Sequence, residues 1–305
     1  MKVPYIKMLV LLGFVSSTLQ MNAQQDPQFT QYMYNVMSVN PGYTGSRENL
    51  VVYGLHRTQW VGLDGAPQTS IFSADSPIGK NVGLGLQVLH DELGPSSETY
   101  LDVNFSYTLK VDDFWNLGLG LKAGGRFFNI DWSRGITDNP DIIFQQNVSE
   151  FFPTIGAGAY LYGERTYVGL SVPNIFAQDH YDEIQESVAA ERLHFFFIAG
   201  HVFDLSQKTK FKPAAYMKYV EGTPLSVDLS ANFMFNEKFV LGLAYRWNDS
   251  FSGLIGLQLT DQLHLGYAYD FTTSNLRNYN NGTHEIMLRF ELKSAESKVK
   301  SPRFF

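Results

Sequence analysis

The 305-residue chain contains no cysteine. This absence excludes a disulfide framework and a thiolate metal site. It also excludes a lipid anchor attached through cysteine. The fold must therefore be held by ordinary side-chain packing or by a sheet that closes on itself.

Charged residues are scarce, at 17% of the chain against roughly 25% in ordinary soluble domains. Acidic residues outnumber basic ones, and the formal net charge is −7. Recognition of a nucleic-acid backbone requires clustered Lys and Arg. We therefore expect no nucleic-acid partner.

Long apolar runs are also missing. Beyond the N-terminal stretch, no segment approaches the about 18 consecutive apolar residues of a transmembrane helix. Aromatic residues nevertheless reach 15%, with 24 Phe and 17 Tyr, and the chain has 26 Gly. A chain rich in aromatic residues, poor in charge and without long apolar runs favours strands over helices.

Residues 1–23 have the pattern of a secretory signal peptide. Lys2 and Lys7 precede the apolar run 8–15, and small and polar residues follow as far as Ala23. The apolar run is well short of the ~20 residues that a spanning helix needs, so we do not expect a retained anchor. We predict cleavage after Ala23 and export from the cytoplasm.

From about Leu50 onward, apolar residues alternate with polar or small ones. Successive side chains of a strand point to opposite faces, so each such segment has one apolar face and one polar or small face. Roughly fourteen segments follow this pattern, many near the 9–11 residues that span a bilayer when tilted. The clearest examples are residues 82–88, 116–122, 226–233, 263–270 and 285–292.

The connections between these segments fall into two classes that alternate along the chain. The tight ones are 75–81, 111–113, 163–165, 205–208, 236–238 and 261–262. The connections between those are mostly longer: 57–68, 91–98, 131–151, 174–190, 220–223, 248–252 and 273–282. An outer-membrane barrel has this arrangement, with tight periplasmic turns and extended external loops, whereas a soluble sandwich has no reason to adopt it.

We therefore predict an all-β fold, a transmembrane outer-membrane β-barrel of about 14 antiparallel strands over residues 49–293. The predicted location is the cell outer membrane, in contact with its lipid. The polar faces should line the lumen, through Lys122, Asp228, Arg246, Gln258, His264, Asp270, Glu285 and Arg289. Aromatic residues near strand ends should form interfacial girdles, through Tyr100, Trp115, Tyr160, Tyr167 and Trp247.

Residues 24–48 have a different pattern. Phe29, Tyr32, Met33 and Val36 recur at helical spacing, between Asp26-Pro27 and Asn40-Pro41-Gly42. We predict an N-terminal periplasmic segment with a short amphipathic helix, tucked into the barrel mouth. An irregular stretch along the wall is the alternative. Residues 294–305 are predicted to form a polar C-terminal tail.

The patterns that could carry chemistry are incomplete. Gly118 and Gly120 match part of a dinucleotide-binding string, but they lie inside an alternating segment, where glycine relieves crowding on the inner face of a strand. The seven His show no metal-ligand spacing, and the acidic loop 179–191 lacks the regular positions of a calcium loop. We expect no enzymatic activity, no cofactor and no metal.

Several segments carry a resemblance to a known family. They are Asp-Pro-Gln-Phe-Thr-Gln-Tyr-Met-Tyr-Asn at 26–35, Asn-Pro-Gly-Tyr-Thr-Gly at 40–45, Arg-Thr-Gln-Trp-Val-Gly at 57–62, Gly-Ala-Pro-Gln-Thr at 65–69 and Ser-Pro-Arg-Phe-Phe at 301–305. With these segments the chain resembles the PorP/SprF family of Bacteroidetes outer-membrane proteins. The family often has Ala where Gly42 stands and Tyr where Phe304 stands.

This resemblance implies a role in type IX secretion and in the gliding machinery associated with it. It implies docking or anchoring of secreted proteins such as adhesins, through their C-terminal sorting domains, and contact with other secretion components, including periplasmic ones. The alternative function is a passive or ligand-specific outer-membrane channel. Arg57 and Trp60 lie in the first predicted external connection, and we take them as candidate binding residues, with pinning of that loop over the barrel mouth as the alternative role.

Overall fold

The structure is a computed structural model that describes residues 27–47, 49–134, 147–176, 193–221 and 223–292. The predicted signal peptide (1–23), the C-terminal tail (294–305) and the acidic loop (179–191) lie outside the described residues. Within the described ranges, no helix is long and apolar enough to cross a membrane.

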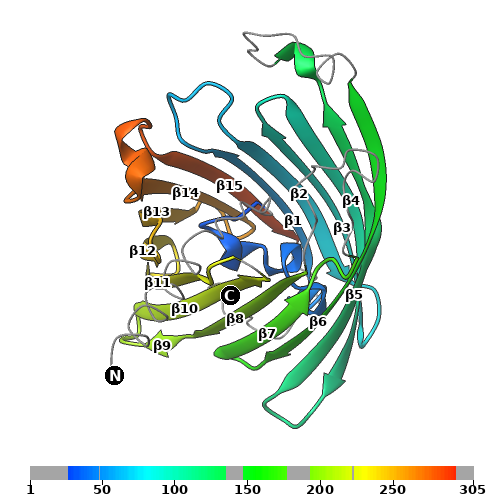
Figure 1. The fold of residues 1–305 in the computed structure, drawn as a ribbon. Helices are drawn as coiled ribbons and strands as arrows, with labels where there is room; N and C mark the ends of the chain where they lie inside the picture. The colour runs from blue at the N-terminus through cyan, green and yellow to red at the C-terminus, as the bar shows by residue number, and fades with distance from the viewer. Residues whose placement is uncertain (1–26, 48, 135–146, 177–192, 222, 293–305) are drawn as a thin grey trace, which may run out of the picture.

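The described strands form one antiparallel sheet that closes into a barrel (Figure 1). The circle closes through the pairing of β1 with β15 and of β10 with β11. β9 pairs with β10 beside β8 and continues its path, so the barrel has 14 strands around its circumference, as the sequence predicted. The strands are β1 (Leu50–Thr58), β2 (Gln68–Pro77), β3 (Val82–Leu93), β4 (Ser96–Lys110), β5 (Asn116–Ile130), β6 (Val148–Tyr162), β7 (Thr166–Val172), β8 (His194–His201), β9 (Phe203–Asp204), β10 (Thr209–Val220), β11 (Ser226–Phe235), β12 (Phe239–Arg246), β13 (Ser250–Gln258), β14 (Leu263–Thr272) and β15 (Thr283–Leu292).

The burial pattern is the reverse of a soluble protein. Apolar side chains on the outer face are exposed, for example Leu243 at 71% and Leu86 at 58%. Polar side chains on the inner face are buried, for example Asn232 and Lys122. Lipid accounts for both, because hydrocarbon is a good environment for apolar side chains and offers no partner for a free backbone N–H or C=O. The barrel is therefore an outer-membrane protein.

The two ends of the barrel differ in their connections. One end has the short turns 78–81, 111–115, 163–165, 205–208, 236–238 and 259–262, and the other has longer connections such as 59–67 and 273–282 (upper part of Figure 1). In outer-membrane barrels the short turns are periplasmic. We call the two ends the periplasmic and the external end accordingly.

One predicted external loop is wrong. Residues 91–98 were expected to form a longer connection, but β3 runs to Leu93 and β4 starts at Ser96, so only Gly94 and Pro95 lie between them. Polar side chains pair across the two strands there, as His90 does with Thr99 at 2.8 Å. The apolar alternation therefore ends where the two strands leave the membrane, whereas the pairing of the two strands continues as far as the turn.

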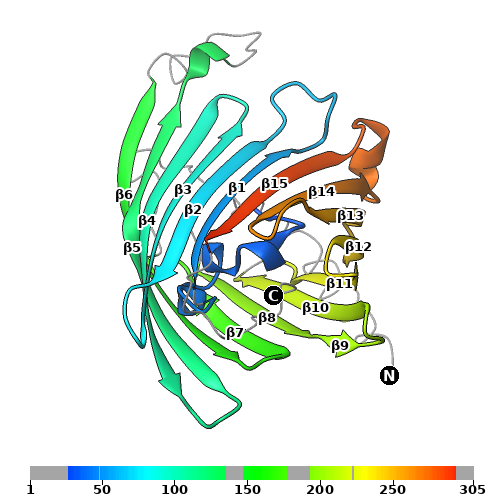
Figure 2. The same cartoon turned by 180° about the vertical axis from the view of Figure 1, so that it is seen from behind.

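Residues 27–47, which we call the lumen plug, lie inside the barrel (blue in Figures 1 and 2). At its start, the Gln28 Nε2 donates to Asp228 Oδ2 at 2.8 Å, close to the external end of β11. Near its end, the Gly45 N–H donates to Asp75 Oδ2 at 2.8 Å, close to the periplasmic end of β2. The plug therefore runs along the lumen from the external half to the periplasmic end, where β1 begins.

The plug is not the amphipathic α-helix that the spacing predicted. It contains three single 3-10 turns, η1 (Tyr32–Tyr34), η2 (Val36–Ser38) and η3 (Pro41–Tyr43). Nearly all of its side chains are buried, because the wall surrounds it. A continuous α-helix gains from having one apolar and one solvated face, and this segment has no solvated face. Its irregular path lets it contact several strands in turn.

Glycines on the inner wall make room for the plug. A Cβ atom on Gly118 would collide with the carbonyl oxygen of Gly42, and one on Gly120 would collide with the backbone of Pro41 and Gly42. Gly83 similarly lies against Thr44. Gly118 and Gly120 thus lie within a strand and relieve crowding on its inner face, as the sequence predicted.

The aromatic girdle was predicted only in part. Trp247 is 62% exposed just after β12. In contrast, Tyr160 and Tyr167 point into the lumen and are buried, and the ring of Tyr160 lies 5.3 Å from that of Tyr43 in the plug. Tyr100 also faces inward, toward the plug. The prediction assigned these tyrosines to lipid because a polar lumen was assumed, whereas the plug gives the wall an apolar surface to pack against.

The glycine contacts predict the effect of adding a side chain. Gly120→Val should overpack the plug and lower the free energy of unfolding by about 1–3 kcal/mol. The matched control is Gly253→Val, because Gly253 faces outward and has open space around its Cα. Thermal unfolding of the two variants in detergent measures the difference, and equal stability would mean that the plug does not contact β5 closely.

Candidate functional site

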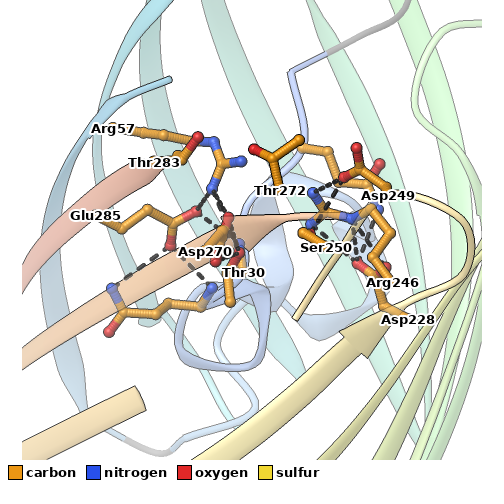
Figure 3. A network of polar contacts seen from close by, with 12 residues as sticks. Thr30, Arg57, Asp228, Arg246, Asp249, Ser250, Asp270, Thr272, Thr283 and Glu285 are labelled. Atoms are coloured by element: carbon orange, nitrogen blue, oxygen red, sulfur yellow. Dashed lines mark hydrogen bonds and ion pairs between the residues drawn. The ribbon is translucent and has the colours of Figure 1, made fainter. Parts of the chain in front are cut away.

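The strongest polar contacts between plug and wall surround Arg57 near the external end of β1 (Figure 3). The Arg57 Nη1 donates to Asp270 Oδ2 at 2.8 Å and forms a second, short ion pair with Glu285. The side chains of Arg57, Asp270 and Glu285 are 3%, 4% and 1% exposed. We call these three residues, together with Thr30 and Gln31 of the plug, the Arg57 cluster.

The cluster has two carboxylates and one guanidinium, so the wall alone leaves a buried negative charge without a full counterion. Backbone groups of the plug compensate for it. The N–H groups of Thr30 and Gln31 donate to the two Glu285 oxygens at 2.6 and 3.0 Å, and the Thr30 hydroxyl donates to Asp270 Oδ2 at 2.8 Å. Hydrogen bonds to ionised groups are stronger than those between neutral groups. The plug is therefore part of the charge balance of the wall.

A second charged group lies beside the cluster in Figure 3. The guanidinium of Arg246 binds Asp228 through Nε and Nη2, at 2.9 and 3.1 Å, and Asp249 through Nη1 at 3.2 Å. Gln28 of the plug donates to Asp228. Both charged groups thus hold the same end of the plug, next to the external connections.

The rest of the plug is attached by single contacts along the lumen. Ser171 donates its hydroxyl to the Val39 carbonyl at 2.6 Å, and Ser106 donates to the Thr44 carbonyl at 2.5 Å. Arg47 pairs with Glu291 of β15 at 3.3 Å. Contacts from many strands therefore fix the plug throughout its length, and not only at one end.

The structure separates the two predicted binding residues. Arg57 was expected in the first external connection, but it lies within β1 with its side chain buried in the lumen. The reason is that the strand runs two residues further than the apolar pattern suggested. Trp60 does lie in the connection, where it adopts a positive φ of 45° and donates its backbone N–H to Thr283 Oγ1 at 3.2 Å.

The first external connection is tied to the last one. The Val61 N–H donates to the Gly282 carbonyl at 2.9 Å, and the Asn281 N–H donates to the Val61 carbonyl at 2.8 Å. Residues 59–67 and 273–282 therefore form one external surface beside the seam between β1 and β15. The side chain of Trp60 is half-buried on this surface.

Sequence reasoning identified Asp270 and Glu285 as lumen residues but missed their pairing with Arg57 and the plug. They are 213 and 228 residues from Arg57, and nothing in their spacing indicates contact. Among the residues that the structure describes, no group of three His, Asp or Glu side chains is placed to hold a metal ion. The arrangement of charged groups in the lumen is suited to holding the plug.

The burial of the Arg57 cluster predicts a large mutational effect. Arg57→Met would leave two buried carboxylates without a guanidinium, so the free energy of unfolding should fall by about 3–5 kcal/mol. The control is Arg165→Met, because Arg165 is 59% exposed in its pair with Asp204 and such surface pairs contribute about 1 kcal/mol or less. Chemical unfolding in detergent compares the two, and a small loss for both would contradict the proposed charge balance.

Comparison with solved structures identifies the fold. The monoaromatic hydrocarbon channel CymD superposes with a TM-score of 0.51 at 12% identity, covering 87% of this chain and 94% of that one. A FadL homologue from Pseudomonas aeruginosa gives a TM-score of 0.43 at 11% identity, covering 80% and 90% of the two chains. The NanC porin gives 0.44 at 10% identity, covering 80% and 100%. These similarities concern only the barrel fold.

No curated protein matches the chain. The model of one family, described as the type IX secretion system membrane protein PorP/SprF, matches residues 21–290. The match includes the plug and all strands except the last residues of β15. The chain therefore belongs to the PorP/SprF family of type IX secretion system membrane proteins.

Proposed function

We propose that this barrel is a docking component of the type IX secretion system, which holds secreted proteins such as adhesins at the cell surface through their C-terminal sorting domains. The observation that carries the proposal is the lumen plug, which occupies the interior and is held there by buried charges. A barrel with an occupied lumen offers its external and periplasmic surfaces to partners. Family membership supports a role in this secretion system.

The surface proposed for docking is the joined pair of external connections, 59–67 and 273–282. Backbone hydrogen bonds join the two connections, so the surface is ordered before a partner binds. A rigid surface loses less conformational entropy on binding than a flexible one. Trp60 is the proposed binding residue there, because tryptophan is enriched at the energetic centres of protein interfaces.

Other proposed partners follow from the location. The apolar outer face contacts outer-membrane lipid. The short turns at the opposite end are available to periplasmic components of the secretion and gliding machinery. No catalytic step is part of the proposed function.

The alternative is a passive or ligand-specific channel. The fold similarity to a hydrocarbon channel leaves this function open, since the barrel architecture is shared. The plug argues against free passage of solutes through the centre. In planar bilayers we expect the wild-type protein to give no steady conductance, and steady or ligand-dependent currents would favour the channel.

Docking predicts co-purification from the native outer membrane. Affinity purification of the tagged protein in mild detergent should recover large secreted proteins that carry type IX sorting domains, identified by mass spectrometry. Recovery of the barrel alone, from a preparation in which other membrane complexes survive, would count against docking.

Single tryptophan variants test the proposed surface. Trp60→Ala should reduce recovery of the secreted protein by tenfold or more, since loss of a central tryptophan costs about 2 kcal/mol or more. Trp115→Ala is the matched control, because Trp115 lies at the periplasmic end beside β5. Equal recovery with both variants would place the docking surface elsewhere.

A further inference from the structure

An open-mouthed cavity lies between the plug and the wall from β3 to β8. Its volume of about 70 Å³ is several times the roughly 10–15 Å³ that one water molecule needs. The plug contributes Phe29 and Val39, and the wall contributes Leu89 and Phe196. Space for a molecule larger than water therefore exists inside the barrel, beside the plug.

The polar groups of the cavity lie in one row across the wall. Strand register places Gln87 of β3 opposite Asp102 of β4, then Gly124 of β5, then Thr154 of β6. Gly124 has no side chain, so the Thr154 hydroxyl reaches across it and donates to Asp102 Oδ1 at 2.9 Å. A Cβ atom at Gly124 would lie 2.5 Å from that same oxygen.

Apolar groups lie in the next inward-facing row toward the external end. Leu89 follows Gln87 on the same face of β3 and pairs in register with Tyr100 of β4. The apolar side chains of Phe29 and Val39 in the plug and of Phe196 also line the cavity. A molecule in the cavity therefore meets polar groups at one end and an apolar surface over the rest of its body.

The charges in the cavity are already balanced. Lys122, which is 5% exposed, lies with its Nζ 3.3 Å from Asp102 Oδ2 and 3.5 Å from the Ser38 carbonyl. Asp102 also accepts the hydrogen bond from Thr154. A charged ligand would have to disrupt this pair, so the cavity suits a neutral one.

One polar atom in the row lacks a partner. Gln87 is 4% exposed, and its Oε1 accepts no hydrogen bond from any described residue. An unsatisfied buried acceptor costs about 1–3 kcal/mol, and a donor that reaches it recovers this energy.

We propose that this cavity binds a small neutral molecule with an apolar body about the size of one aromatic ring and a hydroxyl group that donates to Gln87 Oε1. The body packs between Leu89 and Phe196 on the wall and Phe29 on the plug. Because the ligand contacts both plug and wall, its binding stabilises the plugged barrel. The site is independent of the proposed docking surface, which lies on the external connections.

The test uses two probes that differ only in the hydroxyl group, 4-fluorophenol and fluorobenzene. Their binding to the purified barrel in lipid nanodiscs is measured by fluorine NMR, with empty nanodiscs correcting for partition into lipid. We expect saturable binding of both probes, with 4-fluorophenol about tenfold tighter because of one additional hydrogen bond. Absence of saturable binding, or equal affinity for the two probes, would overturn the proposal.

Variants locate the binding to the cavity. Gln87→Leu should abolish the preference for 4-fluorophenol, and Leu89→Trp should fill the cavity and weaken both probes at least about tenfold. Gln68→Leu is the matched control for Gln87→Leu, because Gln68 is exposed at the external end of β2. Thermal unfolding checks that each variant is folded. An unchanged preference in folded Gln87→Leu, or unchanged binding in folded Leu89→Trp, would show that the probes bind elsewhere.

Discussion

The need to pair every backbone N–H and C=O in hydrocarbon determines the rest of this structure. Strands satisfy that need only if the sheet has no edge, so β15 must return to β1. A barrel of 14 strands is wider than its own inward side chains can fill. The outer face must be apolar, and the polar residues are left to the inner face. The lumen is therefore a wide space lined both by polar side chains and by apolar ones that pack on the N-terminal segment, which occupies it.

The polar wall explains how the plug is held. Buried charges require compensation, and Asp270 and Glu285 obtain it from Arg57 together with the hydroxyl and backbone N–H groups at the start of the plug. Toward the periplasmic end, charged contacts such as the pair of Arg47 with Glu291 continue, and glycines such as Gly120 also let the plug backbone approach the wall closely.

Much of the barrel could be predicted from sequence because its physical cause is local. Alternation in segments such as 263–270 reports directly which side chains face lipid, and the burial pattern of β14 agrees with it. The plug is a different case, since its conformation depends on a wall built from residues far away in the chain. Helical spacing from Phe29 to Val36 therefore predicted an α-helix where three 3-10 turns are found. The orientation of Tyr160 and the partners of Arg57 were missed for the same reason.

Several polar contacts of the N-terminal segment lie at the place where the first and last strands meet. Arg47 and Asn49, just before β1, both bind Glu291 of β15, and Thr30 and Gln31 bind Glu285 of the same strand. The plug and β1 lie at the start of the barrel sequence and β15 lies at its end, so the seam between β1 and β15 cannot form before the whole barrel is present. The hydrogen bonds that Glu285 and Glu291 make with the N-terminal segment depend on that same strand, so the plug gains its full set of contacts only in the closed barrel.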